Sequence, residues 1–133
     1  MKRVVLATLA SGVWINVSEF LRNEILFKGQ WVAKYETLGL EFPSAPVNGA
    51  LWGLWGFIFA GCIVALHHRS TFARTTALSW TLGFVLMWIV VGNLNVLPVG
   101  LLWVAVPWSL AEVALAVVIT QSIIKNRRAE PEN

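Results

Sequence analysis

Ionisable side chains inside long apolar runs are the residues of this sequence that could do chemistry. Glu112 lies near the middle of the run from Val99 to Ile124, and Glu19 and Arg22 lie three residues apart in the first apolar run. A charged side chain far from water is costly in a membrane, so its presence there predicts a functional role. We expect Glu112 and Glu19 to exchange protons or cations, with Arg22 as their counter-ion.

The depth of Glu112 is its main distinguishing feature. At about 1.5 Å per residue, it lies roughly 18 to 20 Å along a helix from either end of its run. Ser109 and Ala116 share its face, and Pro107 weakens the backbone one turn earlier. We therefore expect this face to point into a helix bundle. The alternative is a buried carboxylate that serves assembly alone.

The first apolar run carries a polar stripe. A step of about 100° per residue places Gly12, Asn16, Glu19 and Asn23 on one side of a helix, and apolar residues cover the opposite side. This pattern predicts a helix with its polar side inward. Alternatively, the span ends near Leu21 and the residues beyond it form a polar cap at the membrane surface.

Aromatic and amide side chains fall at the same depth as these acids. The chain has 8 Trp. We expect Trp55, Trp88 and Trp108 to act as stacking surfaces, and Asn16, Asn23 and Asn93 to form a hydrogen-bonding wall. Aromatic faces beside carboxylates suit a cationic or flat amphiphilic ligand. The alternative is an interfacial aromatic belt, which explains Trp31 and Trp103 better.

The composition of the chain indicates the kind of structure that positions these residues. Of the 133 residues, 57% are hydrophobic and 13% are charged, about half the charge of a water-soluble domain. Each of the four apolar runs is long enough for a membrane core that needs about 20 helical residues. We predict an all-α bundle of four transmembrane helices in a single membrane domain, 1–133. Its predicted parts are helices at about 4–27, 47–68, 72–97 and 99–124, an extracytoplasmic loop at 28–46 and a polar tail at 125–133.

The basic residues predict the orientation. When four helices alternate in direction, 7 of the 10 basic residues fall on one side, which the positive-inside rule makes cytoplasmic. They are Lys2, Arg3, Arg69, Arg74, Lys125, Arg127 and Arg128. Both termini are then cytoplasmic, and the net charge of +3 is an orientation signal, which excludes a nucleic-acid partner. A cleaved signal peptide is the alternative, but its apolar part, Val4 to Ala10, is short and its removal would leave three helices.

Small residues line one face of the second predicted helix. Gly49, Gly53, Gly56 and Ala60 are spaced by four, three and four residues, which predicts close helix packing. The neighbour is either a helix of this chain or, in a homo-oligomer or larger membrane complex, a helix of a partner.

Other site chemistry is not indicated. The sequence has no GxGxxG, P-loop, HExxH, GxSxG or CxxC motif. The single Cys62 allows no disulfide within the chain, and adjacent His67 and His68 point about 100° apart on a helix, so they cannot hold one metal ion. We expect no metal or cofactor, and an enzyme is the least favoured class because no nucleophile and base can be paired.

Two resemblances add to these expectations. Four helices in a short chain, with an embedded Glu on the first, make it similar to the small multidrug resistance transporters, which exchange protons for hydrophobic cations; the long loop and the charge bias depart from that family. The stretch FKGQWVAKYETLGL, residues 27–40, resembles small bacterial inner-membrane proteins of unknown function. That resemblance implies a multi-pass protein of the bacterial inner membrane in contact with its lipids.

Two functions remain for these residues. The first is binding or transport of a small cationic or amphiphilic solute in a Trp-lined polar pocket in the outer half of the bundle. The second is a non-catalytic accessory or assembly subunit of a membrane complex, in which the same polar groups hold helices together.

Overall fold

The chain folds as helices joined by short turns. The computed structural model describes residues 1–125, and for Lys125 the backbone alone. Its elements are α1 (Lys2–Phe20), η1 (Leu21–Leu26), α2 (Lys28–Thr37), α3 (Pro46–His67), α4 (Phe72–Trp80), η2 (Thr81–Val85), α5 (Leu86–Asn93), η3 (Val99–Leu101) and α6 (Leu102–Lys125). The segments η1 and η2 are π-helical, and η3 is a 3₁₀ turn. Most of the predicted tail, 125–133, lies outside the described residues.

Four helical segments are long and apolar enough to cross a membrane, as predicted. They are Lys2–Leu26, Pro46–His67, Phe72–Asn93 and Val99–Ile124, with mean hydropathy between 1.6 and 2.0. Two of them are continuous only because a π-helical segment joins their parts: η1 extends α1, and η2 joins α4 to α5. The chain thus has the helices of a multi-pass membrane protein.

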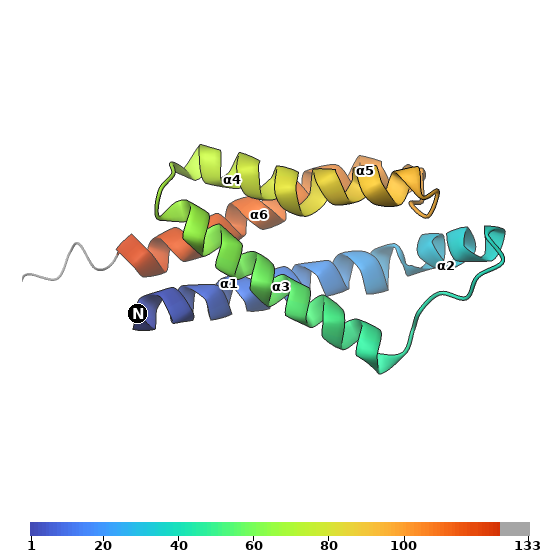
Figure 1. Cartoon of the computed structure of the whole chain (residues 1–133), viewed down its shortest axis with the longest axis horizontal. Coiled ribbons are helices and arrows are strands. Elements are labelled where there is room, and N and C mark those ends of the chain that lie inside the picture. Colours follow the sequence, from blue (N-terminus) through green and yellow to red (C-terminus); the bar gives the residue numbers. More distant parts are fainter. Residues whose placement is uncertain (126–133) are drawn as a thin grey trace, which may run out of the picture.

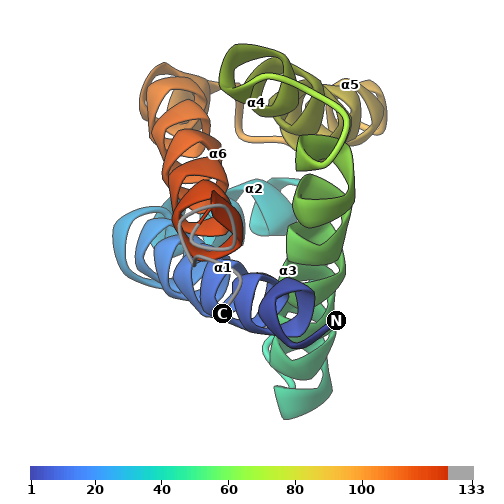
Figure 2. The same ribbon diagram turned by 90° about the vertical axis from the view of Figure 1, so that its left-hand side faces the viewer.

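The helices surround a common interior (Figures 1 and 2). Helices α1 and α6 run side by side, α3 crosses α1 at a steep angle, and α4 packs against α6 and α3. The N-terminus, the turn between α3 and α4, and the end of α6 share one end of the molecule, and α2 lies at the other (Figure 1). The helices that carry Glu19 and Glu112, α1 and α6, are neighbours.

Apolar side chains fill the interior and also cover the outside. The main core cluster consists of Ile15, Phe59, Ala60, Ile63, Phe84, Val113, Ala116 and Val117. Large apolar side chains such as Leu54, Ile89 and Trp103 are exposed on the outer surface. An outer surface of this kind suits a lipid environment.

Helix α2 lies in the stretch predicted as a loop. Residues 28–37 contain good helix formers, and the breakers Gly39 and Pro43 come only after them. Trp31 packs with Phe27, Leu97 and Leu101 in a second apolar cluster. This helix therefore rests on the end of the bundle that is opposite to the N-terminus.

Small residues allow α3 to approach α1. A Cβ atom on Gly56 would lie 2.6 Å from Asn16 Nδ2, and one on Gly53 would lie 3.8 Å from Asn16 Oδ1, whereas one on Gly49 would meet nothing within 4 Å. Asn16 Nδ2 donates a hydrogen bond to the Gly53 carbonyl oxygen at 3.3 Å. The partner of this small-residue face within the chain is thus the first helix.

Candidate functional site

The first half of the site is an ion pair at the end of α1. Arg22 Nη2 donates to Glu19 Oε1, and Asn23 Nδ2 donates to Glu19 Oε2 at 2.7 Å. Both oxygens of the Glu19 carboxylate are therefore satisfied. The pair follows from helix geometry, because residues three and four apart lie on the same face. Glu19 and Arg22 are 8% and 3% exposed, so burial makes this pair part of the interior.

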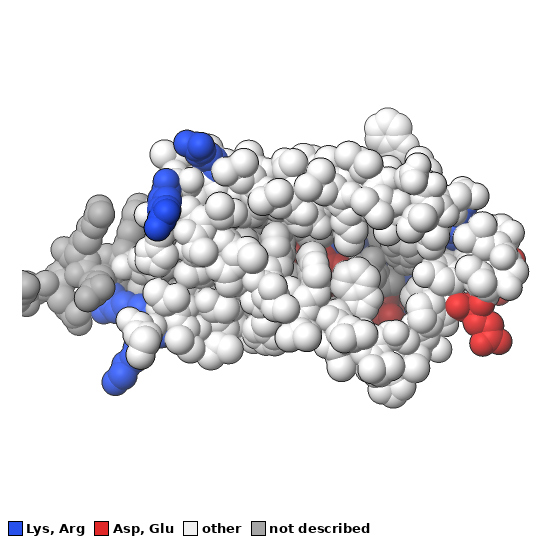
Figure 3. Space-filling view, in the orientation of Figure 1, with Lys and Arg blue, Asp and Glu red and all other residues white. Residues whose placement is uncertain are grey.

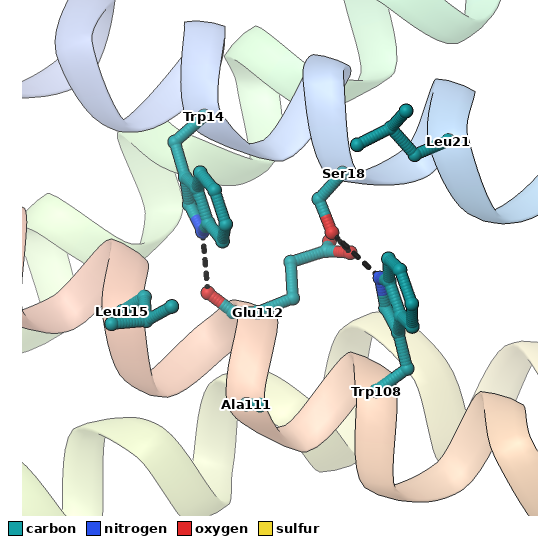
Figure 4. A pocket seen from close by; sticks show the side chains of 7 residues that line it. All are labelled: Trp14, Ser18, Leu21, Trp108, Ala111, Glu112 and Leu115. Carbon is teal, nitrogen blue, oxygen red and sulfur yellow. Dashed lines mark hydrogen bonds between the residues drawn. The ribbon is translucent and has the colours of Figure 1, made fainter.

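The second half of the site is Glu112 on α6. Its side chain is 1% exposed and turns toward α1, where Ser18 Oγ donates to Glu112 Oε2 at 2.5 Å. Trp108 Nε1 donates to Ser18 Oγ at 2.9 Å, and Trp14 Nε1 donates to the Glu112 carbonyl oxygen at 3.0 Å (Figure 4). Two indoles thus hold Glu112 and its hydroxyl partner in place.

The two halves meet. Glu112 interacts electrostatically with both Glu19 and Arg22, so the structure brings together the three charged residues that the sequence singles out. The acidic cluster, defined as Glu19, Arg22 and Glu112, holds two carboxyl groups and one guanidinium. Figure 3 shows acidic atoms recessed near the middle of one face, between an end that carries basic groups and an end that carries exposed acidic groups. With both carboxyl groups ionised, the cluster carries one unbalanced negative charge.

Several buried polar atoms of the cluster lack a hydrogen bond. Within residues 1–125, Glu112 Oε1 has no hydrogen-bond partner, and neither do Arg22 Nε and Nη1. Buried polar atoms are nearly always paired with protein or water, and leaving one unpaired costs about 1–3 kcal/mol. The cluster therefore offers an unused acceptor and unused donors to a small polar ligand or to water.

Both π-helical segments contribute to the site. Arg22 belongs to η1 and Phe84 to η2, and the guanidinium carbon of Arg22 lies 5.1 Å from the centre of the Phe84 ring, a cation–π distance. A π-helical turn changes which side chains face inward, and such turns are frequent at functional sites. Here the two segments place a cation and an aromatic face against each other in the bundle.

Helix α2 contributes one contact beside the cluster. Trp31 Nε1 donates to Asn23 Oδ1 at 3.2 Å, so α2 is linked to the amide that holds Glu19. Trp31 is half-buried here and is not a free surface anchor, whereas Trp103 is 88% exposed.

A pocket between α1 and α6 leads to Glu112. It has a volume of about 210 Å³ and is lined by Trp14, Ser18, Leu21, Trp108, Ala111, Glu112 and Leu115. Figure 4 shows the two indole rings on either side of the Glu112 side chain. Leu21 and Leu115 are exposed on the outer surface, so this pocket opens sideways, toward the position of the lipid.

A second groove lies between α3 and the helix formed by α4, η2 and α5. It has a volume of about 530 Å³, and its lining is apolar apart from Ser79 and Cys62. Trp55 lines it and stacks on Phe59 with ring centres 5.1 Å apart. This groove holds no acidic residue.

The remaining residues predicted for the site lie around it or away from it. Trp55 and Trp88 pack against Phe84, at centroid distances of 6.0 and 5.7 Å, and so support the ring under Arg22 without lining the pocket of Glu112. Asn16 binds the backbone of α1 and α3. Asn93 is exposed at the end of α5, and none of the hydrogen bonds of the described residues joins its side chain to the cluster.

Ser18, Trp14 and Phe84 are site residues that the sequence reasoning missed. Ser18 lies four residues from both Trp14 and Arg22, so the spacing places all three on one side of α1. That spacing was the available signal. No sequence signal pointed to Phe84, because its contact with Arg22 involves residues in two π-helical segments.

The chemistry available to this site is that of paired acids in an apolar surrounding. Within residues 1–125, no three His, Cys, Asp or Glu side chains are grouped as metal ligands would be. Comparisons of the chain with known protein families, with curated proteins and with solved structures give no match.

Proposed function

We propose that this chain binds or transports a small cationic or amphiphilic solute at the acidic cluster. The observation that carries the proposal is the meeting of two carboxyl groups and one guanidinium in the interior of four apolar helices. An uncompensated charge in such surroundings is very unfavourable, so a further positive charge is needed. A bound cation or a proton provides it.

The roles differ between the two acids. Glu19 is fully hydrogen-bonded to Arg22 and Asn23, which makes it the fixed partner of the pair. Glu112 has one oxygen held by Ser18 and one oxygen without a partner in the described part of the chain. We assign the exchange of cations or protons mainly to Glu112, with Arg22 as the counter-ion that keeps Glu19 in place.

The test is the substitution Glu112→Gln, which removes the charge and nearly keeps the shape. We expect saturable binding of organic cations, among them phenethylammonium and tetraphenylphosphonium, to weaken by about tenfold to a hundredfold because a buried charge partner is lost. Calorimetric titration of the purified chain in lipid nanodiscs measures this effect.

The matched control is Glu24→Gln. Glu24 is an exposed acid five residues after Glu19, and it pairs with Lys28 at 2.6 Å, so its loss should leave binding unchanged. Equal binding of every cation by wild-type protein and Glu112→Gln would overturn the proposal.

A second function, that of an accessory subunit, has its own supporting observation. Ser11 Oγ lies 3.0 Å from Thr120 Oγ1 and donates to the Ala116 carbonyl oxygen at 3.1 Å. Together with the Ser18 and Glu112 contact, these bonds fasten α1 to α6 without any ligand. If Glu112→Gln abolishes folding and changes the oligomeric state, assembly is favoured over solute binding.

We also propose that the protein is an inner-membrane protein of a bacterium with both ends in the cytoplasm. The basic residues of the N-terminus and of the turn between α3 and α4 gather at one end (Figure 3), which supports this orientation under the positive-inside rule. In this orientation the acidic cluster lies in the outer half of the membrane.

A further inference from the structure

We infer that the pocket between α1 and α6 selects a compact apolar amine that enters from the lipid and donates an N–H hydrogen bond to Glu112. This inference rests on the proposed function, and it adds the class of ligand, the place where it binds and its route of entry. It starts from the lining of the pocket, which combines two indoles, one hydroxyl and one carboxyl group with small and branched aliphatic side chains.

The hydrogen-bonding state of the pocket defines the charged end of the ligand. The O–H donor of Ser18 is already used, since it donates to Glu112 Oε2, and the Ser18 oxygen also accepts from Trp108. Glu112 Oε1 is buried and has no hydrogen-bond partner within residues 1–125. An ammonium group with N–H bonds satisfies this acceptor and the charge together, whereas a quaternary ammonium group can supply only the charge.

The walls of the pocket define the rest of the ligand. The indoles of Trp14 and Trp108 stand on either side of Glu112 (Figure 4), and both of their N–H groups are occupied by hydrogen bonds within the protein. Their ring faces therefore remain for an apolar or aromatic body and for the cation. A volume of about 210 Å³ is below the roughly 300–1,000 Å³ of sites for drug-sized molecules, so the ligand is compact.

The position of the opening defines the route. Leu21, Ala111 and Leu115 surround the pocket and are exposed on the apolar outer surface of a membrane-spanning helix pair. On the side of the cluster that faces α2, Asn23 donates to Glu19 and accepts from Trp31, so its amide group is already hydrogen-bonded within the protein. A ligand that first partitions into the bilayer meets this opening directly.

The experiment follows the indole N–H signals of the full chain, labelled with ¹⁵N, in lipid nanodiscs. Phenethylammonium and its N,N,N-trimethyl analogue are titrated under the same conditions. Assignments come from single Trp→Phe variants, and exposed Trp103 serves as the internal reference. Since affinities are compared between two ligands on the wild-type protein, the Trp14 and Trp108 variants serve only to assign their own indole signals.

We expect phenethylammonium to shift the Trp14 and Trp108 signals saturably and to bind about tenfold or more tightly than the trimethyl analogue. Equal binding of the two cations, or shifts confined to Trp55, which lines the second groove, would overturn this inference. Either result would leave the proposed function standing if binding still required Glu112. Absence of saturable binding by both cations, together with unchanged tetraphenylphosphonium binding in Glu112→Gln, would overturn both.

Discussion

Ser18 joins the two acidic helices through a single hydroxyl group. It donates to Glu112 at 2.5 Å and accepts from Trp108 at 2.9 Å, and its exposed fraction is 2%. Removing the hydroxyl leaves a carboxyl oxygen and an indole N–H without their partners. In an apolar interior such unpaired groups are costly.

Ser18→Ala should therefore destabilise the fold by about 1–3 kcal/mol, the cost of leaving buried polar groups unpaired. The free energy of unfolding in a denaturing-detergent titration measures this effect. Ser122→Ala is the matched control, because Ser122 is exposed and donates within its own helix to the Val118 carbonyl oxygen. If the two variants lose equal stability, Ser18 does not have the role given to it here.

At this scale the charged residues were more predictable than their partners. Glu112 was identifiable from its depth, and Glu19 with Arg22 from their spacing, because both arguments need only helix geometry. Trp14 was not identifiable, since its importance comes from a hydrogen bond to the Glu112 carbonyl oxygen across the interface of α1 and α6. Such a bond depends on how two helices are rotated against each other, which periodicity alone does not determine.

At the scale of elements, the crossing of α1 and α3 depends on small residues. Gly56 faces Asn16, and Phe57 of α3 lies against Gly12 of α1, where an added Cβ would be 2.3 Å from the Phe57 ring. Close approach of this kind strengthens packing between helices in a membrane. It also fixes Asn16, which bridges the two backbones.

Gly56→Ala should lower the free energy of unfolding by about 1–3 kcal/mol, because the new methyl group forces Asn16 to move and to lose its bond to Gly53. Gly49→Ala on the same face should be neutral or slightly stabilising, since its Cβ meets nothing within 4 Å and Ala favours a helix. Thermal unfolding of the two variants in the same detergent provides the comparison. A neutral Gly56→Ala would argue against this packing.

The π-helical segments mark the limit of prediction for the elements. Long apolar runs indicated where helices lie, but η1 and η2 differ from an α-helix by only a wider turn, and hydropathy does not register that difference. Helix α2 was hidden for another reason: Lys28, Lys34 and Glu36 make its stretch polar, and the breakers that follow it dominated the pattern.

At the scale of the molecule, the distribution of charge relates the site to the membrane. Basic residues gather at one end, and acidic residues at the other end and in the recessed middle (Figure 3). Four alternating helices follow from the number of apolar runs, and this part of the fold was predictable from composition and length. The rotation of each helix about its own axis was not predictable in this way, and this rotation turns Glu112 toward α1.

The proposed orientation predicts a labelling pattern. In a Cys62→Ser background, Ser44→Cys should react with a membrane-impermeant maleimide added to intact cells, because residue 44 precedes α3 at the outer end. Ser70→Cys, in the turn between α3 and α4, should react only after the membrane is opened. The reverse pattern would show that the positive-inside argument fails for this chain.

The unbalanced charge of the acidic cluster leads to the most direct test. When no other cation is present, a proton must neutralise the extra carboxyl group, since an uncompensated charge in the bundle is too costly. Calorimetric titration of phenethylammonium and tetraphenylphosphonium at pH 7, in buffers with different heats of ionisation, counts the protons released on binding. We expect release of about one proton per bound cation in the wild-type protein and none in Glu112→Gln. Binding without proton release, or equal release by the variant, would contradict the exchange of a proton for the cation at Glu112.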